Sequence, residues 1–108
     1  GSQPACWLEV KSVTLVTDQL ARFPDAPTAR GRRHVAELTQ AVLAGERATI
    51  ALVVQRPDAD RFAPNDPADP AFGAALRLAA RSGVQIRAFT CHVSTTSVGP
   101  AREIPVEL

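Results

Sequence analysis

An apolar run near the start of the chain, from Cys6 to Val16, contains neither glycine nor proline and is rich in β-branched residues. This composition predicts a β-strand, and its apolar character predicts that the strand is buried on both faces. Because side chains alternate along a strand, Trp7, Glu9 and Lys11 should share one face, with Val10 on the other. Glu9 and Lys11 are therefore expected to be neighbours in space.

The segments that follow predict a hairpin, a helix and a second strand. Leu20 to Phe23 is expected to return as a hairpin strand before a proline-rich stretch breaks regular structure. Thr28 is a suitable N-cap for a helix that runs to about Ala44, and Gly45 is suited to end it. The apolar run from Ala48 to Val54 then predicts an interior strand.

A polar segment separates this strand from a second helix. Residues 56 to 68 are rich in Pro, Asp and Arg and are expected to form a loop. Asp69 is a suitable cap for a helix with Pro70 at its first position and Gly83 after its last turn. The run from Val84 to Cys91 predicts the next strand, and the order strand, helix, strand predicts that these two strands pair in parallel.

The closing residues complete the predicted architecture. Arg102 to Leu108 predicts a short strand, and Pro105 confines it to the edge of a sheet because proline cannot donate to the ladder. We therefore expect an α/β fold with a mixed β-sheet flanked by helices.

Length and composition set the broad class. With 108 residues, 45% of them hydrophobic, the chain can form one domain with its own core. It has no membrane-length apolar run and no recognisable secretion signal, so we expect a cytoplasmic protein without a membrane partner. Gly1-Ser2 is typical of a cleaved expression tag. Cys6 and Cys91 are expected to be free thiols buried as small hydrophobic residues.

The strongest chemical feature is Glu9-Val10-Lys11, which contains the only lysine of the chain. A carboxylate and an ammonium group on an apolar strand are expensive to bury unless they are paired or used. In a metal-dependent phosphodiesterase, Glu9 and the Val10 carbonyl would hold Mg²⁺, while Lys11 would position or deprotonate the attacking water. The alternative is a structural ion pair between Glu9 and Lys11.

A basic group near the start of the first predicted helix is the next candidate. Arg30, Arg33 and His34 lie where the helix dipole attracts anions, and guanidinium groups suit phosphate oxygens. The alternative is a solvated helix face on which Glu37 neutralises Arg33. The net charge of +1 does not by itself indicate nucleic-acid binding.

Gln55 ends the second predicted strand, where an amide can orient a water molecule, so it is a third catalytic candidate. Asp25 and Asp58 lie in proline-bounded loops and are more typical of turn formers. The chain contains no glycine-rich phosphate loop, no hydrolase triad order and no zinc spacing, which argues against those classes.

Several motifs together resemble the SfsA (sugar fermentation stimulation) family over nearly the whole chain. They are Glu9 to Leu15, Phe23 to His34 with Glu37-Leu38, Val54 to Asp58, Arg61 to Asn65, Asp69 to Phe72 and Ile104 to Leu108. The resemblance implies an OB-like N-terminal domain associated with DNA binding and a C-terminal domain similar to PD-(D/E)xK nucleases, in a protein linked to regulation of sugar utilisation genes. Residues 3 to 108 resemble only the C-terminal domain.

By this resemblance Glu9 and Lys11 stand at the E-x-K positions, and Gln55 resembles a strand-end glutamine of some such nucleases. The acidic residue that completes the metal site should precede Glu9, and it is absent here. We therefore expect an incomplete Mg²⁺ site and little nuclease activity in this chain alone, with DNA as partner of the longer protein and homo-oligomerisation left open.

Three hypotheses follow. The first is an incomplete Mg²⁺-dependent nuclease domain with Glu9 as metal ligand, Lys11 as catalytic lysine, and Arg30 and His34 on the adjacent cleft wall. The second is a non-catalytic module for DNA binding or dimerisation, which predicts an exposed basic surface and no response to Mg²⁺. The third is a structural support for the OB-like domain, which predicts a bare apolar face.

Overall fold

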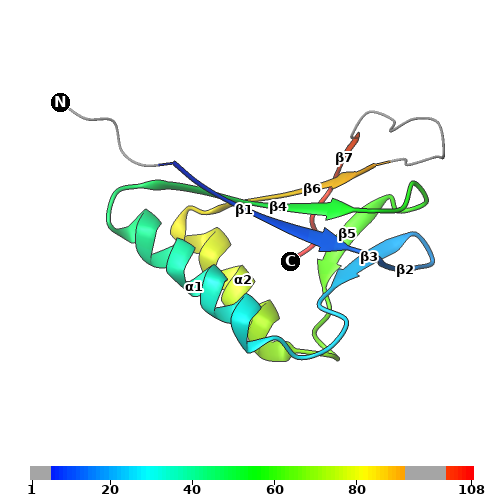
Figure 1. The fold of residues 1–108 in the computed structure, drawn as a ribbon, viewed down its shortest axis with the longest axis horizontal. Helices are drawn as coiled ribbons and strands as arrows, with labels where there is room; N and C mark the ends of the chain where they lie inside the picture. Colours follow the sequence, from blue (N-terminus) through cyan, green and yellow to red (C-terminus); the bar gives the residue numbers. More distant parts are fainter. Residues whose placement is uncertain (1–5, 92–101) are drawn as a thin grey trace.

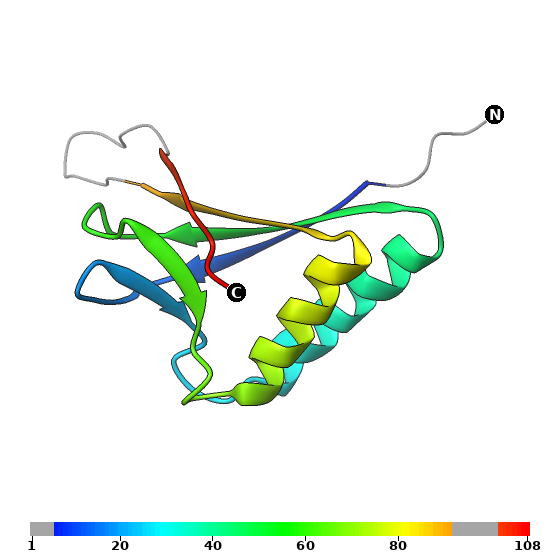
Figure 2. The same ribbon diagram turned by 180° about the vertical axis from the view of Figure 1, so that it is seen from behind.

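The computed structural model describes residues 6–91 and 102–108, which form two β-sheets and two helices, with the helices packed beneath one face of the larger sheet (Figures 1 and 2). The elements in chain order are β1 (Cys6–Val13), β2 (Leu15–Thr17), β3 (Leu20–Phe23), α1 (Ala29–Leu43), β4 (Arg47–Val54), β5 (Arg61–Pro64), α2 (Pro70–Ser82), β6 (Gln85–Thr90) and β7 (Arg102–Ile104).

The strands form two sheets. The larger has the order β1-β4-β6-β7, in which the first three strands are parallel and β7 is antiparallel to β6. The smaller has the order β2-β3-β5. The predicted α/β class, the mixed sheet, the parallel pairing of β4 with β6 and the edge position of the last strand are all confirmed. The helices cover one face of the larger sheet (Figure 2).

The first strand departs from its prediction in two ways. The run from Cys6 to Val16 breaks at Thr14 into β1 and β2, which belong to different sheets. The prediction of burial on both faces is wrong, because β1 is an edge strand and the helices cover only one of its faces. Leu8 and Val10, on the uncovered face, are 64% and 55% exposed.

The smaller sheet confirms one expectation and corrects another. β3 pairs antiparallel with β2, as expected for a hairpin. Both turn residues, Asp18 and Gln19, have positive φ angles of 51° and 68°, which suits the right-handed twist of a two-residue hairpin turn. The segment 56–68, expected to be a loop, contains β5, which pairs in parallel with β3. Four residues ending in proline are too short to show periodicity, so this pairing depends on tertiary structure.

Both helices begin and end where local signals predict. The Thr28 Oγ1 atom accepts a hydrogen bond from the Gly31 N–H at 2.9 Å and caps α1. Pro70 is the first residue of α2, and Gly83 ends that helix with a φ of 113°, a conformation that favours glycine. The prediction for Gly45, which has a φ of 93°, is likewise confirmed.

The core lies between the larger sheet and the helices. Its largest fully buried side chains are Phe62, Phe72, Ile50, Leu52, Leu76, Val13, Val35 and Val54. The Phe72 ring lies edge-on to the Phe23 ring, with 5.2 Å between centroids, and so joins α2 to the end of β3.

The Asp69 carboxylate connects the two helix starts. Its Oδ1 atom accepts a hydrogen bond from the Phe72 N–H at 3.0 Å, which caps α2. Its Oδ2 atom accepts a hydrogen bond from the Thr28 N–H at 2.9 Å, immediately before α1. These N–H groups, that of Thr28 foremost, hold the pKa of Asp69 below its usual value.

We expect Asp69→Asn to lower the Tm by roughly 5 °C or more. An amide offers only one acceptor oxygen, so one of the two N–H groups would lose its partner. Because the folded pKa is lowered, the carboxylate contributes its full stability above the unfolded pKa of about 3.9 and loses it as the pH falls through the folded pKa.

Thermal unfolding from pH 7 to pH 3 tests this prediction. The variant should be less stable at pH 7 and should lose less further stability in acid than the original chain. Asp25→Asn, in an exposed loop, is the matched control and should change neither quantity. Equal Tm values for Asp69→Asn and the original chain would contradict the double cap.

The remaining expectations have mixed outcomes. Cys6 and Cys91 are free thiols as predicted, but Cys6 is exposed because β1 begins at a sheet edge, so its predicted burial is wrong. Gly1-Ser2, interpreted as a tag remnant, lies outside the described residues. Within the described ranges, no helix has the length and apolar character needed to cross a membrane.

Candidate functional site

Strand β1 places Glu9 and Lys11 on the face that α1 covers. The Lys11 Nζ atom lies 3.2 Å from the Glu9 Oε1 atom, which confirms that the two side chains are neighbours. The Lys11 side chain is 12% exposed and the Glu9 side chain is 32% exposed. Both charged groups are therefore reachable from solvent and are not sealed beneath other side chains.

His34, on α1, completes a triangle with this pair. Its Nδ1 atom lies 3.3 Å from the Glu9 Oε1 atom and 3.2 Å from the Lys11 Nζ atom. A protonated Nδ1 would donate to Glu9, whereas an unprotonated Nδ1 would accept from Lys11. The ring nitrogen thus has a hydrogen-bond partner whether or not it carries a hydrogen.

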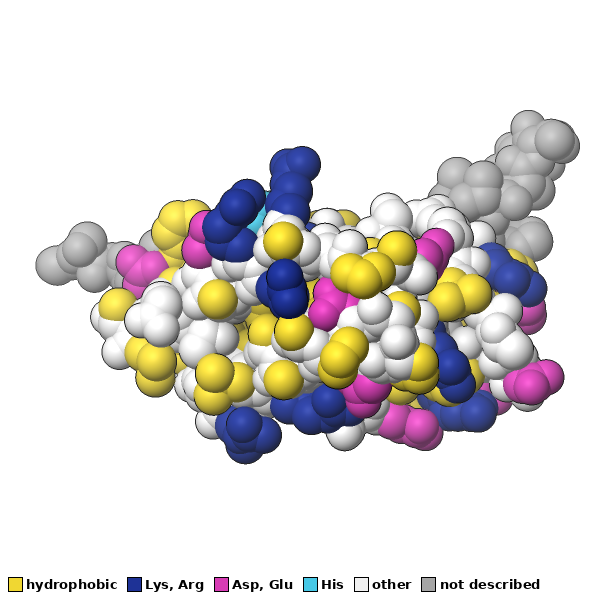
Figure 3. All heavy atoms as spheres, turned by 90° about the horizontal axis from the view of Figure 1, so that it is seen from below, with side chains coloured by type: hydrophobic (Ala, Val, Ile, Leu, Met, Phe, Trp, Pro, Cys, Tyr) yellow, Lys and Arg dark blue, Asp and Glu magenta, His cyan; other side chains and the backbone are white. Residues whose placement is uncertain are grey.

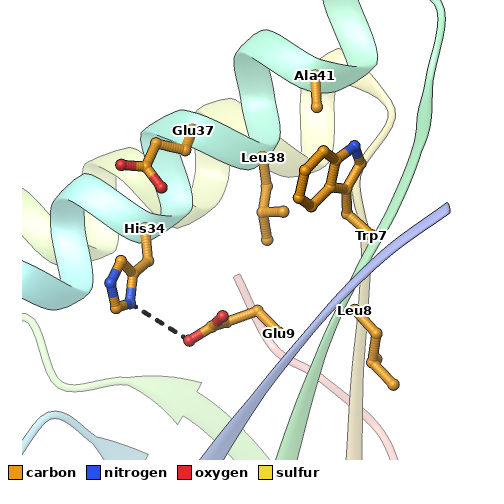
Figure 4. A pocket seen from close by; sticks show the side chains of 7 residues that line it. All are labelled: Trp7, Leu8, Glu9, His34, Glu37, Leu38 and Ala41. Atoms are coloured by element: carbon orange, nitrogen blue, oxygen red, sulfur yellow. Dashed lines mark ion pairs between the residues drawn. The ribbon is translucent and has the colours of Figure 1, made fainter. Parts of the chain in front are cut away.

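Glu9 and His34, two members of this triangle, lie at one side of a cavity of about 280 Å³ between β1 and α1 (Figure 4). The cavity is lined by Trp7, Leu8, Glu9, His34, Glu37, Leu38 and Ala41. In the close view, Glu9 and His34 point toward one another, and Glu37 extends from α1 toward the same space.

Glu37 is a site residue that the sequence did not identify. The alternative interpretation of the helix face paired it with Arg33, but no ion pair joins these two residues, both of which lie in the described part of the chain. It lines the cavity instead. Its position three residues after His34 on the helix is the only sequence signal that could have suggested this placement.

The Val10 carbonyl points to the open edge of β1. The Val13 carbonyl accepts a hydrogen bond from the Gln55 N–H at 2.8 Å and so faces β4. Successive carbonyls along a strand point to opposite edges, so the carbonyl of Val10 faces away from β4. β1 has no other partner strand in the described sheet, which leaves this oxygen free to bind a ligand.

Glu9 and Val10 supply only part of a metal site. Mg²⁺ and Ca²⁺ take six or more oxygen ligands in total. Residues 6–91 and 102–108 contain no group of three or more His, Cys, Asp or Glu side chains that could hold a metal ion. Glu9 and Val10 therefore offer one carboxylate and one carbonyl, and further oxygens would have to come from water or from other groups.

The structure does not bring Gln55 to this cluster. β4 runs parallel to β1 with Ile50 opposite Glu9, so Gln55 lies five residues farther along, roughly 16 Å in the strand direction. Its Oε1 atom lies 3.5 Å from the Cys91 Sγ atom. A catalytic role for Gln55 remains a prediction, and the position of Gln55 away from Glu9 does not support it.

The two arginines predicted to bind phosphate lie on α1 beside the site. Arg30 and Arg33 are exposed, and His34, four residues after Arg30, is partly buried against Glu9. Figure 3 shows Lys and Arg side chains gathered around a histidine on this face of the molecule. The structure thus places basic side chains next to the cavity without assigning them a ligand.

The two loop acids are separate from the site. Asp58 forms a hydrogen-bonded ion pair with Arg56, with distances of 3.0 Å and 2.6 Å, and Asp25 is exposed. This is consistent with their interpretation as turn residues.

Fold and site together define an α/β domain with a Glu-x-Lys pair at the edge of a mixed sheet. The family model described as "Sugar fermentation stimulation protein RE domain" matches residues 1–97. A solved structure of Pyrococcus furiosus SfsA in complex with Ca²⁺ is similar with a TM-score of 0.88 and 34% identity, covering 94% of this chain and 44% of that one.

Curated proteins similar in sequence to this chain belong to the same family. The sugar fermentation stimulation protein homolog of Desulforamulus reducens is 46% identical over 108 residues, covering 100% of this chain and 45% of that protein. The homolog of Symbiobacterium thermophilum is 51% identical over 110 residues, covering 97% of this chain and 44% of that protein. The chain belongs to the SfsA family, as the resemblance implied, and spans less than half the length of these relatives.

Proposed function

We propose that this chain is the nuclease-like half of an SfsA protein and that Glu9 and Lys11 act on a phosphodiester of DNA. The observation that supports this is the triangle of Glu9, Lys11 and His34, with all three contacts between 3.2 Å and 3.3 Å, of which Glu9 and His34 line a cavity. A structural ion pair alone would require neither a cavity nor a third titratable partner.

Each residue has a role in this proposal. Glu9 and the Val10 carbonyl are the ligands that this chain contributes to a divalent cation, which would neutralise charge on the phosphate. Lys11 positions or deprotonates the attacking water and offsets charge that develops on the phosphate oxygens. His34 holds Lys11 and Glu9 in place and can exchange a proton at its Nδ1 atom.

Arg30 and Arg33 bind the phosphates that flank the reacting one. They are exposed in the first two turns of α1, near the end of the helix where the dipole favours anions. Such contacts position DNA without reading its sequence.

We expect Arg30→Ala and Arg33→Ala each to weaken DNA binding and to reduce the slope of log affinity against log salt by about one. Fluorescence anisotropy with a labelled DNA at several salt concentrations measures both quantities. Arg81→Ala, at an exposed position in the last turn of α2, is the matched control and should leave the slope unchanged. Equal slopes for all three variants would exclude this basic face as the phosphate contact.

A non-catalytic module for DNA binding or dimerisation is the second candidate. It is favoured by the fact that Glu9 already pairs with Lys11 and His34, together with the lack of a three-ligand metal cluster in the described ranges. The exposed Leu8 and Val10 also fit the third hypothesis, in which a bare apolar face supports an OB-like domain. A cytoplasmic location, homo-oligomerisation and a role in sugar utilisation remain predictions.

A further inference from the structure

Trp7 is the only tryptophan of the chain, and its side chain is 49% exposed although it lines the cavity beside Glu9. Its Nε1 atom donates a hydrogen bond to the Glu46 Oε2 atom, just beyond the end of α1. This bond holds the indole at one edge, near the end of α1. An oriented aromatic surface left half exposed in a cavity is suited to stacking against a flat ligand.

The other walls define what kind of flat ligand fits. Leu38 and Ala41 extend from α1 on the same side of the cavity as the indole (Figure 4). The volume of about 280 Å³ lies just below the usual range for drug-sized ligands, so it suits a single ring system better than a whole nucleotide. The cavity therefore has an aromatic and aliphatic end matched to a planar ring.

The charged side chains favour different positions for the base and for the phosphate of a nucleotide. Glu37 lines the polar end of the cavity beside Glu9, and its carboxylate repels phosphate and accepts hydrogen bonds from N–H groups. Arg30 and Arg33, which attract phosphate, are exposed on α1 outside the cavity lining. A bound strand would thus place a base in the cavity and a phosphate that flanks the reacting one on the helix.

We propose that this cavity binds a nucleobase stacked on Trp7 and that the substrate class is single-stranded nucleic acid. The inference rests on the proposed function and specifies its substrate. Bases in a duplex are stacked on one another and would have to be extruded first, so a single strand should bind more tightly.

The single indole allows a direct test, because the chain should show one indole N–H signal in a ¹⁵N–¹H correlation spectrum. We expect dAMP to shift this signal and to quench the tryptophan fluorescence, whereas deoxyribose 5-phosphate should do neither. Equal responses to the two compounds would overturn base stacking on Trp7.

Variants test the same proposal with longer ligands. Trp7→Ala should weaken binding of a single-stranded oligonucleotide at least about fivefold and leave binding of an abasic strand unchanged. Leu78→Ala, which removes a side chain that is 50% exposed on α2, is the control and should affect neither. Circular dichroism establishes that both variants are folded.

The outcomes separate this inference from the proposed function. If Trp7→Ala weakens binding of the oligonucleotide and of the abasic strand equally, or weakens neither, base stacking on Trp7 is overturned. If the abasic strand still binds through Arg30 and Arg33, the proposed phosphate contact is retained. Tighter binding of duplex than of single strand overturns the substrate class. Absence of binding by every probe overturns the inference together with the DNA-binding proposal.

Discussion

Changing Glu9 to Gln is expected to abolish divalent-cation binding and to lower DNA cleavage at least about 100-fold in an SfsA protein of full family length that carries this domain. Glu9 is the carboxylate next to the outward-facing Val10 carbonyl, and an amide cannot supply the same negative charge. Calorimetry with Mg²⁺ and Mn²⁺ measures binding, and nicking of plasmid DNA measures cleavage. This chain of 108 residues by itself should show little of either, because the described residues contain no group of three or more possible metal-binding side chains.

Two further variants sharpen this experiment. Lys11→Met should lower cleavage while leaving cation binding in place, because the proposed mechanism assigns the lysine to the attacking water and the phosphate oxygens and not to the metal. Glu103→Gln is the control, since Glu103 pairs with Arg87 on another strand of the same sheet, away from the cavity. Cation binding that persists in Glu9→Gln, or is absent from the unchanged long protein, would leave Glu9 and Lys11 as a structural pair and favour the DNA-binding module.

Changing Phe72 to Ala is expected to lower the free energy of unfolding by about 3–5 kcal/mol. The Phe72 side chain is 0% exposed, and a Cβ atom added at Gly31 would lie 3.5 Å from its ring. The ring therefore packs against both α1 and Phe23, and its loss leaves a cavity where the helices meet. Urea unfolding followed by circular dichroism measures the effect.

Phe89→Ala is the matched control for this prediction. Phe89 is only partly buried, and its ring lies 5.2 Å from the Arg87 guanidinium carbon. It should lose clearly less stability than Phe72→Ala, because less apolar surface is returned to water. Similar losses at both positions would show that the helix junction is not the main part of the core. A loosened α1 should also displace His34 from Glu9.

The helices and their ends could be predicted because their signals are local. Thr28 caps α1 by bonding a backbone N–H three residues away, and Asp69 does the same for α2. Gly83 ends α2 with a positive φ that other residues rarely adopt. Such interactions are encoded within a few residues, so they can be recognised without knowledge of the rest of the fold.

The neighbouring placement of Glu9 and Lys11 was also predictable, because side-chain alternation is a property of any strand. The exposure of one face of that strand could not be predicted. An apolar run is equally compatible with an interior position and with an edge, and only the strand order put β1 at the edge with Leu8 uncovered. The pairing of β5 with β3 was hidden for the same reason, since no local pattern marks it.

By itself, the sequence determined the α/β class, the helix boundaries and the shared face of Glu9 and Lys11. The first hypothesis placed His34 on a wall adjacent to this pair, but only the tertiary structure decided that His34, 23 residues after Lys11, contacts both residues and that Trp7 and Glu37 line a cavity there. The physical reason is that periodicity and capping act over a few residues, whereas the packing of α1 on β1 depends on the whole core.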